Sequence, residues 1–308
     1  MTNSTEQGLD RGGIAAALAA FIFWGLVPIY YKALQTVGAW EVLAHRVIWS
    51  VPVLLVFLAV RDGKKIWQRL RLPASSIAWL MLSGLVLALN WLVFVWAVAN
   101  DRVLDTSLGY FGTPLVNVFL GFLILKERLT RYQVVAVTVA AMGTVYLAWF
   151  LGTPPWVALT LAVSFGTYGL LRKRLDVGPM LGLLWETLLI FLPALAYVFW
   201  LALHSSSNFL QSSLSIDLLL VGSSLVTVLP LIWFNMAAQK LPLSILAFFQ
   251  YIAPTMSFLL AVFLYDERFT QGHAVAFACI WLALALVSIE PFQRARRRLR
   301  SYKRAGVV

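Results

Sequence analysis

Two uninterrupted apolar runs constrain this chain more than any other feature. Residues 77–99, IAWLMLSGLVLALNWLVFVWAVA, and residues 132–151, YQVVAVTVAAMGTVYLAWFL, contain no charged side chain. A helix needs about 20 mostly apolar residues to cross a bilayer, and a buried helix of a soluble protein rarely stays apolar for so long. Each run therefore predicts a transmembrane helix.

Runs of the same kind recur along the whole chain. Of the 308 residues, 61% are hydrophobic and 12% are charged, whereas a soluble domain has about 45–50% and about 25%. Lipid offers no partners to backbone N–H and C=O groups, and the runs are continuous, so the predicted class is an all-α polytopic membrane protein. We expect ten spans, at residues 14–34, 42–60, 77–99, 105–125, 132–151, 156–172, 180–203, 216–239, 242–264 and 272–290.

The net charge of +11 is distributed as in a membrane protein. With the N-terminus in the cytoplasm, 20 of the 24 Lys and Arg residues fall in cytoplasmic segments, three fall outside and Arg46 lies within a span. This asymmetry predicts that both chain ends are cytoplasmic. We expect the basic tail, residues 291–308, to lie against anionic lipid rather than against nucleic acid, although RNA binding is the alternative for such a segment.

The sequence lacks the patterns of a metal centre or a disulfide framework. Cys279 is the single cysteine, and His45, His204 and His273 do not have the spacing of metal ligands. HExxH, P-loop and GxSxG motifs are absent as well, which argues against an intramembrane enzyme and against ATP-driven transport. We therefore expect neither a metal nor an organic cofactor.

The second half of the chain repeats the first. Residues 111–133, FGTPLVNVFLGFLILKERLTRYQ, align without a gap with residues 251–273, YIAPTMSFLLAVFLYDERFTQGH, at an offset of 140. Because each repeat holds five spans, an odd number, the second enters the membrane from the opposite side, and inverted repeats place a substrate site at their interface. The predicted organisation is a cytoplasmic segment, two five-helix repeats and a basic tail, at residues 1–13, 14–151, 156–290 and 291–308.

Five motifs follow one another along the chain: GLVPIYYKAL (25–34), EVLAHRVIWS (41–50), NWLVFVWAVAN (90–100), SLGYFGTPLVNVFLGFLILKERL (107–129) and FFQYIAPTMSFLLAVFLYDERF (248–269). Together they resemble the RarD-type branch of the EamA family, in the drug/metabolite transporter superfamily. The resemblance covers almost the whole chain. It implies a permease of the bacterial inner membrane, with an amino-acid-like, metabolite or phenicol-like substrate.

Arg46 is a permanent charge about five residues into an otherwise apolar span. A charge at a helix centre costs about 2.5–3.5 kcal/mol on insertion scales, so such residues usually face a partner or an aqueous cavity. Arg46 either snorkels to the outer interface or contacts an anion or carboxylate. The repeat offset matches it with Glu186, the only carboxylate in the seventh span. We hypothesise that Arg46 and Glu186 pair within a gate or substrate site; a purely structural pair is the alternative.

Polar and aromatic side chains in other spans extend this candidate pathway. His45 and Glu186 leave proton coupling open, while packing for the histidine and interfacial belts for the aromatic residues are the alternatives. The Glu127–Arg128 and Glu267–Arg268 pairs are interpreted as local, helix-terminating pairs. The further pathway candidates are Asn90, Trp91, Tyr110, Trp233, Asn235, Gln250 and Tyr251, with Pro114 and Pro254 as bending points.

The predicted function is secondary transport of a small organic molecule, with export as the expected direction. Matched inverted repeats suit alternating access, in which one half rocks against the other. A membrane scaffold or receptor without flux is the competing class, and an intramembrane enzyme is a further alternative.

Overall fold

Ten helical segments follow the predicted runs in the computed structural model, which describes residues 10–304 apart from 127, 242–245 and 247. Two short segments, η1 (Gly63–Lys65) and α3 (Ile66–Arg69), connect the second to the third. The described chain contains no strand, so the prediction of an all-α protein is confirmed. The ten are α1 (Arg11–Lys32), α2 (Ala39–Asp62), α4 (Ala74–Ala99), α5 (Val103–Leu125), α6 (Arg131–Leu151), α7 (Trp156–Lys173), α8 (Pro179–Leu203), α9 (Leu214–Lys240), α11 (Ile252–Leu259) continued by the π-helical η2 (Leu260–Leu264), and α12 (Gln271–Arg304).

Eight helices of the described chain are long and apolar enough to cross a membrane. The other two predicted spans are shorter. Helix α7 has 18 residues and ends in two basic side chains, and the α11–η2 segment covers 252–264. The predicted start of the ninth span, at 242, lies outside the described residues, and α12 continues beyond the predicted end of the tenth span to Arg304.

Two helices at matched places in the repeat begin in the same way. Thr130 caps α6: its Oγ1 accepts a hydrogen bond from the Gln133 backbone N–H, and the Gln133 side chain accepts one from the Thr130 N–H. At the start of α12, Thr270 Oγ1 accepts from the His273 N–H and His273 Nδ1 accepts from the Thr270 N–H. This reciprocal arrangement satisfies two backbone donors at once, which explains why both helices start there.

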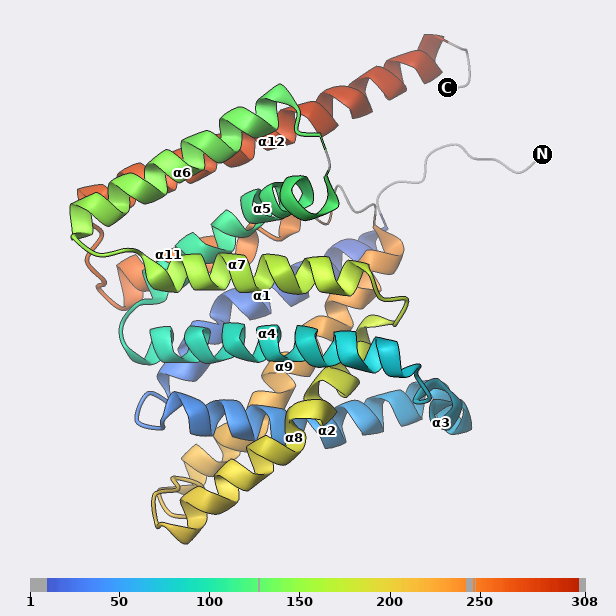
Figure 1. The fold of residues 1–308 in the computed structure, drawn as a ribbon, viewed down its shortest axis with the longest axis vertical. Coiled ribbons are helices and arrows are strands. Elements are labelled where there is room, and N and C mark those ends of the chain that lie inside the picture. Colours follow the sequence, from blue (N-terminus) through green and yellow to red (C-terminus); the bar gives the residue numbers. More distant parts are fainter. Residues whose placement is uncertain (1–9, 127, 242–245, 247, 305–308) are drawn as a thin grey trace.

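The strongest helix–helix contacts join the first five long helices to the last five. Helix α6 packs along α12, α5 against α7, α1 against α9 and α11, α2 against α8 and α9, and α4 against α7 and α8. If the halves are exchanged (α1 for α7, α2 for α8, α4 for α9, α5 for α11), the α1–α9 contact becomes α4–α7 and the α2–α9 contact becomes α4–α8, and both occur. The α6–α12 and α2–α8 pairs lie at opposite ends of the long axis (Figure 1).

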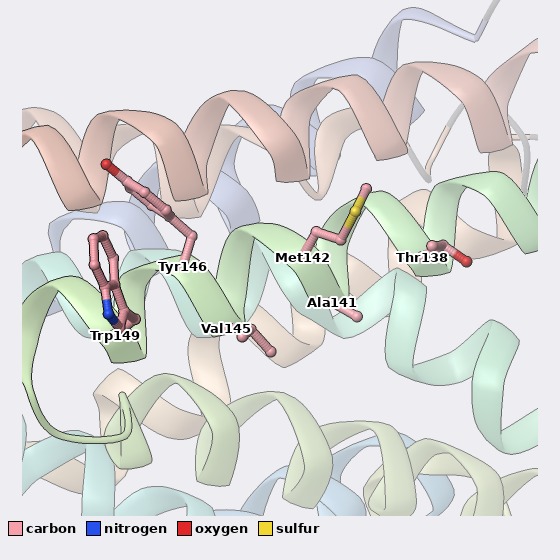
Figure 2. A pocket seen from close by; sticks show the side chains of 6 residues that line it. All are labelled: Thr138, Ala141, Met142, Val145, Tyr146 and Trp149. Carbon is pink, nitrogen blue, oxygen red and sulfur yellow. The ribbon is translucent and has the colours of Figure 1, made fainter.

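Large apolar side chains cover much of the surface. On the outer face of α6, Trp149 is 76% exposed and Val145 is 67% exposed. An apolar hollow of about 490 Å³ lies along this helix and is lined by Thr138, Ala141, Met142, Val145, Tyr146 and Trp149 (Figure 2). Exposed apolar residues of this kind suit contact with lipid, and none of the predicted pathway residues lines the hollow.

Candidate functional site

Arg46 lies buried between the two halves of the protein. Its Nε donates a hydrogen bond to Thr227 Oγ1 of α9 at 2.7 Å. Its guanidinium carbon lies 3.9 Å from the ring centroid of Trp91 in α4 and 5.7 Å from that of Tyr31 in α1. Only 8% of the Arg46 surface is exposed, so this side chain does not snorkel to the interface.

No carboxylate lies within ion-pair distance of Arg46 in the part of the chain that the structure describes. The Arg46 side chain makes one hydrogen bond within the described chain, and Thr227 is the acceptor. Because a guanidinium carries N–H groups on three nitrogens, the Nη1 and Nη2 donors are left for another acceptor. The hydroxyl of Tyr31 is also buried without a hydrogen-bond partner among the described residues. An anion or a strong hydrogen-bond acceptor would complete both groups.

Asn90 and Tyr110 extend this polar region toward α7. The Tyr110 hydroxyl donates to Asn90 Oδ1 at 3.1 Å. Asn90 Nδ2 in turn donates to the Leu161 carbonyl at 3.1 Å and to Ser164 Oγ at 2.9 Å. Both amide hydrogens of Asn90 are therefore used by the protein itself, and its amide ties α4 to α5 and α7.

Glu186 has partners of its own in α4 and α7. Its Oε1 accepts a hydrogen bond from Ser83 Oγ at 2.6 Å, and its Oε2 accepts one from the Tyr168 hydroxyl at 3.3 Å. Arg172 Nη1 lies 3.7 Å from Oε1 and is the ion-pair partner of Glu186 within the described chain. The hypothesis of a direct Arg46–Glu186 pair is therefore wrong for this structure.

The direction of the helices explains why the matched charges do not meet. Arg46 lies seven residues after Ala39, where α2 begins, and Glu186 lies seven residues after Pro179, where α8 begins. These two helices begin at opposite sides of the molecule (Figure 1). Equal distances along oppositely directed helices coincide only at the middle, so equivalent residues elsewhere lie at different depths.

Two polar residues near the start of α2 hold the loop between α8 and α9. Glu41 accepts hydrogen bonds from Ser207 Oγ at 3.1 Å and from the backbone N and Nδ2 of Asn208 at 2.7 and 2.8 Å. The His45 ring lies 4.6 Å from the ring of Phe209, and its Nδ1 accepts from Trp49 Nε1 at 3.2 Å. These contacts favour the packing interpretation of His45.

The remaining predicted side chains have surroundings of their own. Trp233 packs on Phe23 with centroids 5.7 Å apart, and Asn235 Nδ2 donates to a carbonyl of its own helix at 2.7 Å. These contacts are separate from those that Asn90 and Trp91 make. Gln250 is exposed, and Tyr251 stacks on Phe111 with centroids 6.3 Å apart.

The two prolines lie within helices, as expected, and the second also contributes to packing between the halves. Pro114 is inside the continuous α5. The carbonyl of Pro254 in α11 accepts a hydrogen bond from Ser107 Oγ of α5 at 2.7 Å. Helix α11 changes to the π-helical η2 a few residues after this proline. Bending at either site stays a prediction.

Glu267 caps a helix of the other half. Its two carboxylate oxygens accept hydrogen bonds from the backbone N–H groups of Val103 and Leu104, at 2.6 and 2.8 Å, at the start of α5. Burial raises the pKa of Glu267 above its usual value, and this effect exceeds that of the two hydrogen bonds, which lower the pKa. The prediction of a local Glu267–Arg268 pair is therefore wrong, and Glu127 lies outside the described residues.

Sequence reasoning missed five residues that hold the two buried charges. Tyr31 and Thr227 contact Arg46, and Ser83, Tyr168 and Arg172 contact Glu186. Polar side chains inside apolar runs were the available signal for most of them. Arg172 lies in the last turn of α7, where a basic residue is typical of the cytoplasmic end of a span, so the sequence does not mark it as a partner of a buried carboxylate.

The chain is similar to membrane transporters over nearly its full length. The sequence profile of the EamA-like transporter family matches residues 11–149 and again 154–289. An uncharacterized transporter of Vibrio cholerae is 44% identical over 304 residues, which cover 97% of this chain and 100% of the relative. Protein RarD of Escherichia coli is 42% identical over 287 residues, 93% of this chain and 97% of the relative.

A more distant relative and a solved structure extend the comparison. The chloramphenicol-sensitive protein RarD of Pseudomonas aeruginosa is 31% identical over 299 residues, 96% of this chain and 98% of the relative. One crystal structure, at 18% sequence identity, superposes with a TM-score of 0.59 over 90% of this chain and 97% of that one. This last likeness shows a shared fold.

Proposed function

Because the chain belongs to the EamA-like transporter family, in its RarD-type branch, we propose that it is a secondary transporter that moves a small organic molecule by alternating access. Membership of the family makes the chain a multi-pass membrane transporter. We assign it to the bacterial inner membrane with both ends cytoplasmic, in keeping with the distribution of Lys and Arg. Export is the direction that we propose.

Three observations support two inverted five-helix repeats with ten spans. The family profile matches the chain twice, over two segments of similar length. The principal contacts between the halves correspond to one another when the halves are exchanged. The starts of α6 and α12 share one capping arrangement. Two similar halves that pack mainly on each other suit a mechanism in which one half rocks against the other.

The observation that carries the substrate class is the unpaired guanidinium of Arg46, buried between the halves. Its free N–H groups suit a carboxylate or another strongly accepting group, which Arg can bind through two parallel hydrogen bonds. The rings of Tyr31, Trp91 and Tyr110 give the rest of a ligand an aromatic and apolar environment. We therefore propose an amphipathic substrate that carries one such group, as in an amino-acid-like metabolite or a phenicol-like molecule.

Substrate exchange in proteoliposomes tests this proposal. Vesicles loaded with one member of a panel of amino acids, organic acids and chloramphenicol are diluted into the same labelled compound. We expect labelled uptake for at least one accepting compound, partial uptake for Arg46→Lys and a loss of at least about tenfold for Arg46→Gln, since a charge-assisted hydrogen bond contributes about 1.5–3 kcal/mol. Arg61→Gln, at the exposed end of α2, is the matched control and should exchange normally.

Two results would overturn the proposal. Equal exchange by Arg46→Gln and the unchanged protein would remove Arg46 from the substrate site. Absence of exchange and of ligand-induced thermal stabilisation across the panel would favour the scaffold alternative, because a ligand that binds the folded state raises its apparent stability.

A further inference from the structure

A second buried polar site surrounds Glu186, and the substrate proposal does not use it. Glu186 is 1% exposed and lies in α8, where its carboxylate meets side chains of α4 and α7. Ser83 and Tyr168 each donate one hydrogen bond to its carboxylate, at 2.6 and 3.3 Å. A buried carboxylate is expensive unless it is well paired or takes up a proton, so the quality of its ion pair decides which applies.

The ion pair of Glu186 is loose. Arg172 Nη1 lies 3.7 Å from Oε1, beyond hydrogen-bond distance, and this nitrogen is buried without a hydrogen-bond partner among the described residues. The Nη2 atom of Arg172 instead donates to the carbonyls of Val177 and Gly178, at 3.1 and 3.4 Å, in the turn between α7 and α8. Arg172 therefore contacts both the buried carboxylate of Glu186 and the turn that joins α7 to α8.

A glycine makes room for this arrangement. A Cβ atom at Gly182, one turn before Glu186, would lie 2.0 Å from Arg172 Nη1 and 2.4 Å from its guanidinium carbon. With any larger residue at 182, the arginine side chain could not cross α8 at this level. Arg172 can thus reach Glu186 because residue 182 has no side chain.

Few other groups face the carboxylate. Helix α2 presents apolar side chains, including Val47 and Val51, to α8, and α9 adds Val228 to the same apolar cluster. Arg46 is directed at Thr227 and Trp91. In the described chain, Arg172 is therefore the charged group that controls Glu186, and Ser83 and Tyr168 are the neutral ones.

We propose that Glu186 is a proton-binding site that couples transport to the pH gradient. The charge of Glu186 controls Arg172, which acts as a gate residue at the α7–α8 end. This inference rests on the proposed function and deepens it. When a water-borne proton bonds to the carboxylate, Glu186 becomes neutral and Arg172 loses its counter-charge. Arg172 then keeps only its hydrogen bonds to the carbonyls of the turn, and the electrostatic attraction that ties the end of α7 to Glu186 in α8 is lost. Loss of the proton restores the charge of Glu186 and its ion pair with Arg172, so that one proton accompanies each cycle.

Two measurements on the purified full-length protein use the proton itself as the probe and need no substrate. Infrared difference spectra between acidic and alkaline pH report the C=O stretch of a protonated carboxylic acid. We expect a band that disappears as the pH rises, that is lost in Glu186→Gln and that is kept in Asp62→Asn, a carboxylate paired with Arg61 and Arg69 at the end of α2. If Glu186→Gln fails to fold, Ser83→Ala should shift the pH at which the band disappears, because it removes one hydrogen bond from the carboxylate.

The second measurement follows opening of the gate. In a Cys279→Ser background, Leu171→Cys provides one buried thiol next to Arg172 for a water-soluble maleimide. Gly178→Cys, at an exposed position in the turn after α7, is the reference for the reactivity of a free thiol at each pH. Because the thiolate is the reactive form and its fraction rises with pH, each labelling rate is divided by that of the reference thiol at the same pH. We expect this ratio to be several-fold higher at acidic than at alkaline pH, to be high at both pH values in Glu186→Gln, and to depend less on pH in Arg172→Lys. A band that persists in Glu186→Gln, or a labelling ratio that does not depend on pH, would overturn the coupling site.

Failure of this inference can be told from failure of the proposed function. Substrate exchange that is equally fast with and without a pH gradient, in both the unchanged protein and Glu186→Gln, would remove the coupling and leave the transporter. No exchange of any compound, with the carboxylic band intact, would remove the transporter and leave a proton site.

Discussion

The guanidinium carbon of Arg46 lies 3.9 Å from the ring centroid of Trp91, in a region where the described chain supplies no anion. An indole face attracts a cation through its quadrupole, and the attraction reaches about 2 kcal/mol or more when both partners are desolvated. Trp91 therefore partly replaces a counter-ion for Arg46. It stabilises the charge and leaves the hydrogen-bond donors of Arg46 unused.

A double-mutant cycle should detect this interaction. Trp91→Leu, Arg46→Gln and the double variant are compared by thermal unfolding in detergent. We expect a coupling free energy of about 1–2 kcal/mol, because Trp91→Leu should destabilise the protein less once the charge has gone. Trp91→Phe should keep part of the coupling. Additive effects of the two substitutions would show that Trp91 only fills space.

Thr227 should matter through its hydroxyl rather than its volume. Thr227→Val keeps the shape but removes the acceptor for Arg46 Nε, which leaves a buried charged donor unpaired. We expect a loss of about 1.5–3 kcal/mol in stability, with Thr227→Ser close to the unchanged protein. Thr187→Val is the matched control, since that buried hydroxyl donates only to carbonyls of its own helix and should lose less.

Gly109 sets the separation of α5 and α7. A Cβ atom there would lie 2.8 Å from the carbonyl oxygen of Ala158, so Gly109→Ala must push the two backbones apart. We expect a lower melting temperature, by an amount equivalent to about 1–3 kcal/mol. Gly112→Ala, three residues further along the same helix, should be tolerated, because its nearest neighbour would be 3.8 Å away. Equal effects of the two changes would contradict this account.

The cap on α5 predicts a pH dependence of stability. Burial raises the folded-state pKa of Glu267 above the value of 4.5 that applies to the unfolded chain. The folded state then holds this proton more tightly, so the stabilisation is fully present below pH 4.5 and is lost as the pH rises through the folded-state pKa. The stability of the unchanged protein relative to Glu267→Gln should therefore fall with rising pH across that window.

Melting temperatures at several pH values check this sign. The exposed neighbour Asp266 is the control, and Asp266→Asn should follow the pH profile of the unchanged protein. A stability of the unchanged protein that rises with pH relative to that of Glu267→Gln would refute the predicted sign.

Helix positions could be read from the sequence, because lipid leaves a spanning chain little freedom. The run predicted at 77–99 is the helix 74–99, and the run predicted at 180–203 is the helix 179–203. The sequence does not predict that Arg46 packs on Trp91. It does mark Arg46 as a candidate, because a charge within a span is costly.

Partners of the charges could not be read from the repeat. The match between Arg46 and Glu186 establishes equivalence, and equivalence is not proximity when the helices run in opposite directions. Arg172 lies at the end of an apolar run, where a basic residue normally marks the start of a loop. The space beside Gly182, which has no side chain, lets Arg172 turn back into the protein, and this depends on how α7 and α8 pack.

The contact pattern has a consequence for how the protein is made in the cell. Helix α6 has its principal contact with α12, the last helix of the described chain, and α1 packs on α9 and α11, which are also synthesised later. The first half must therefore reside in the bilayer without these partners until the later helices have been inserted, and Arg46 lacks its acceptor Thr227 until α9 is in place. Insertion and packing are therefore separate stages for this chain. A truncation before α12 should remove the principal partner of α6 and leave the first half exposed to membrane proteases.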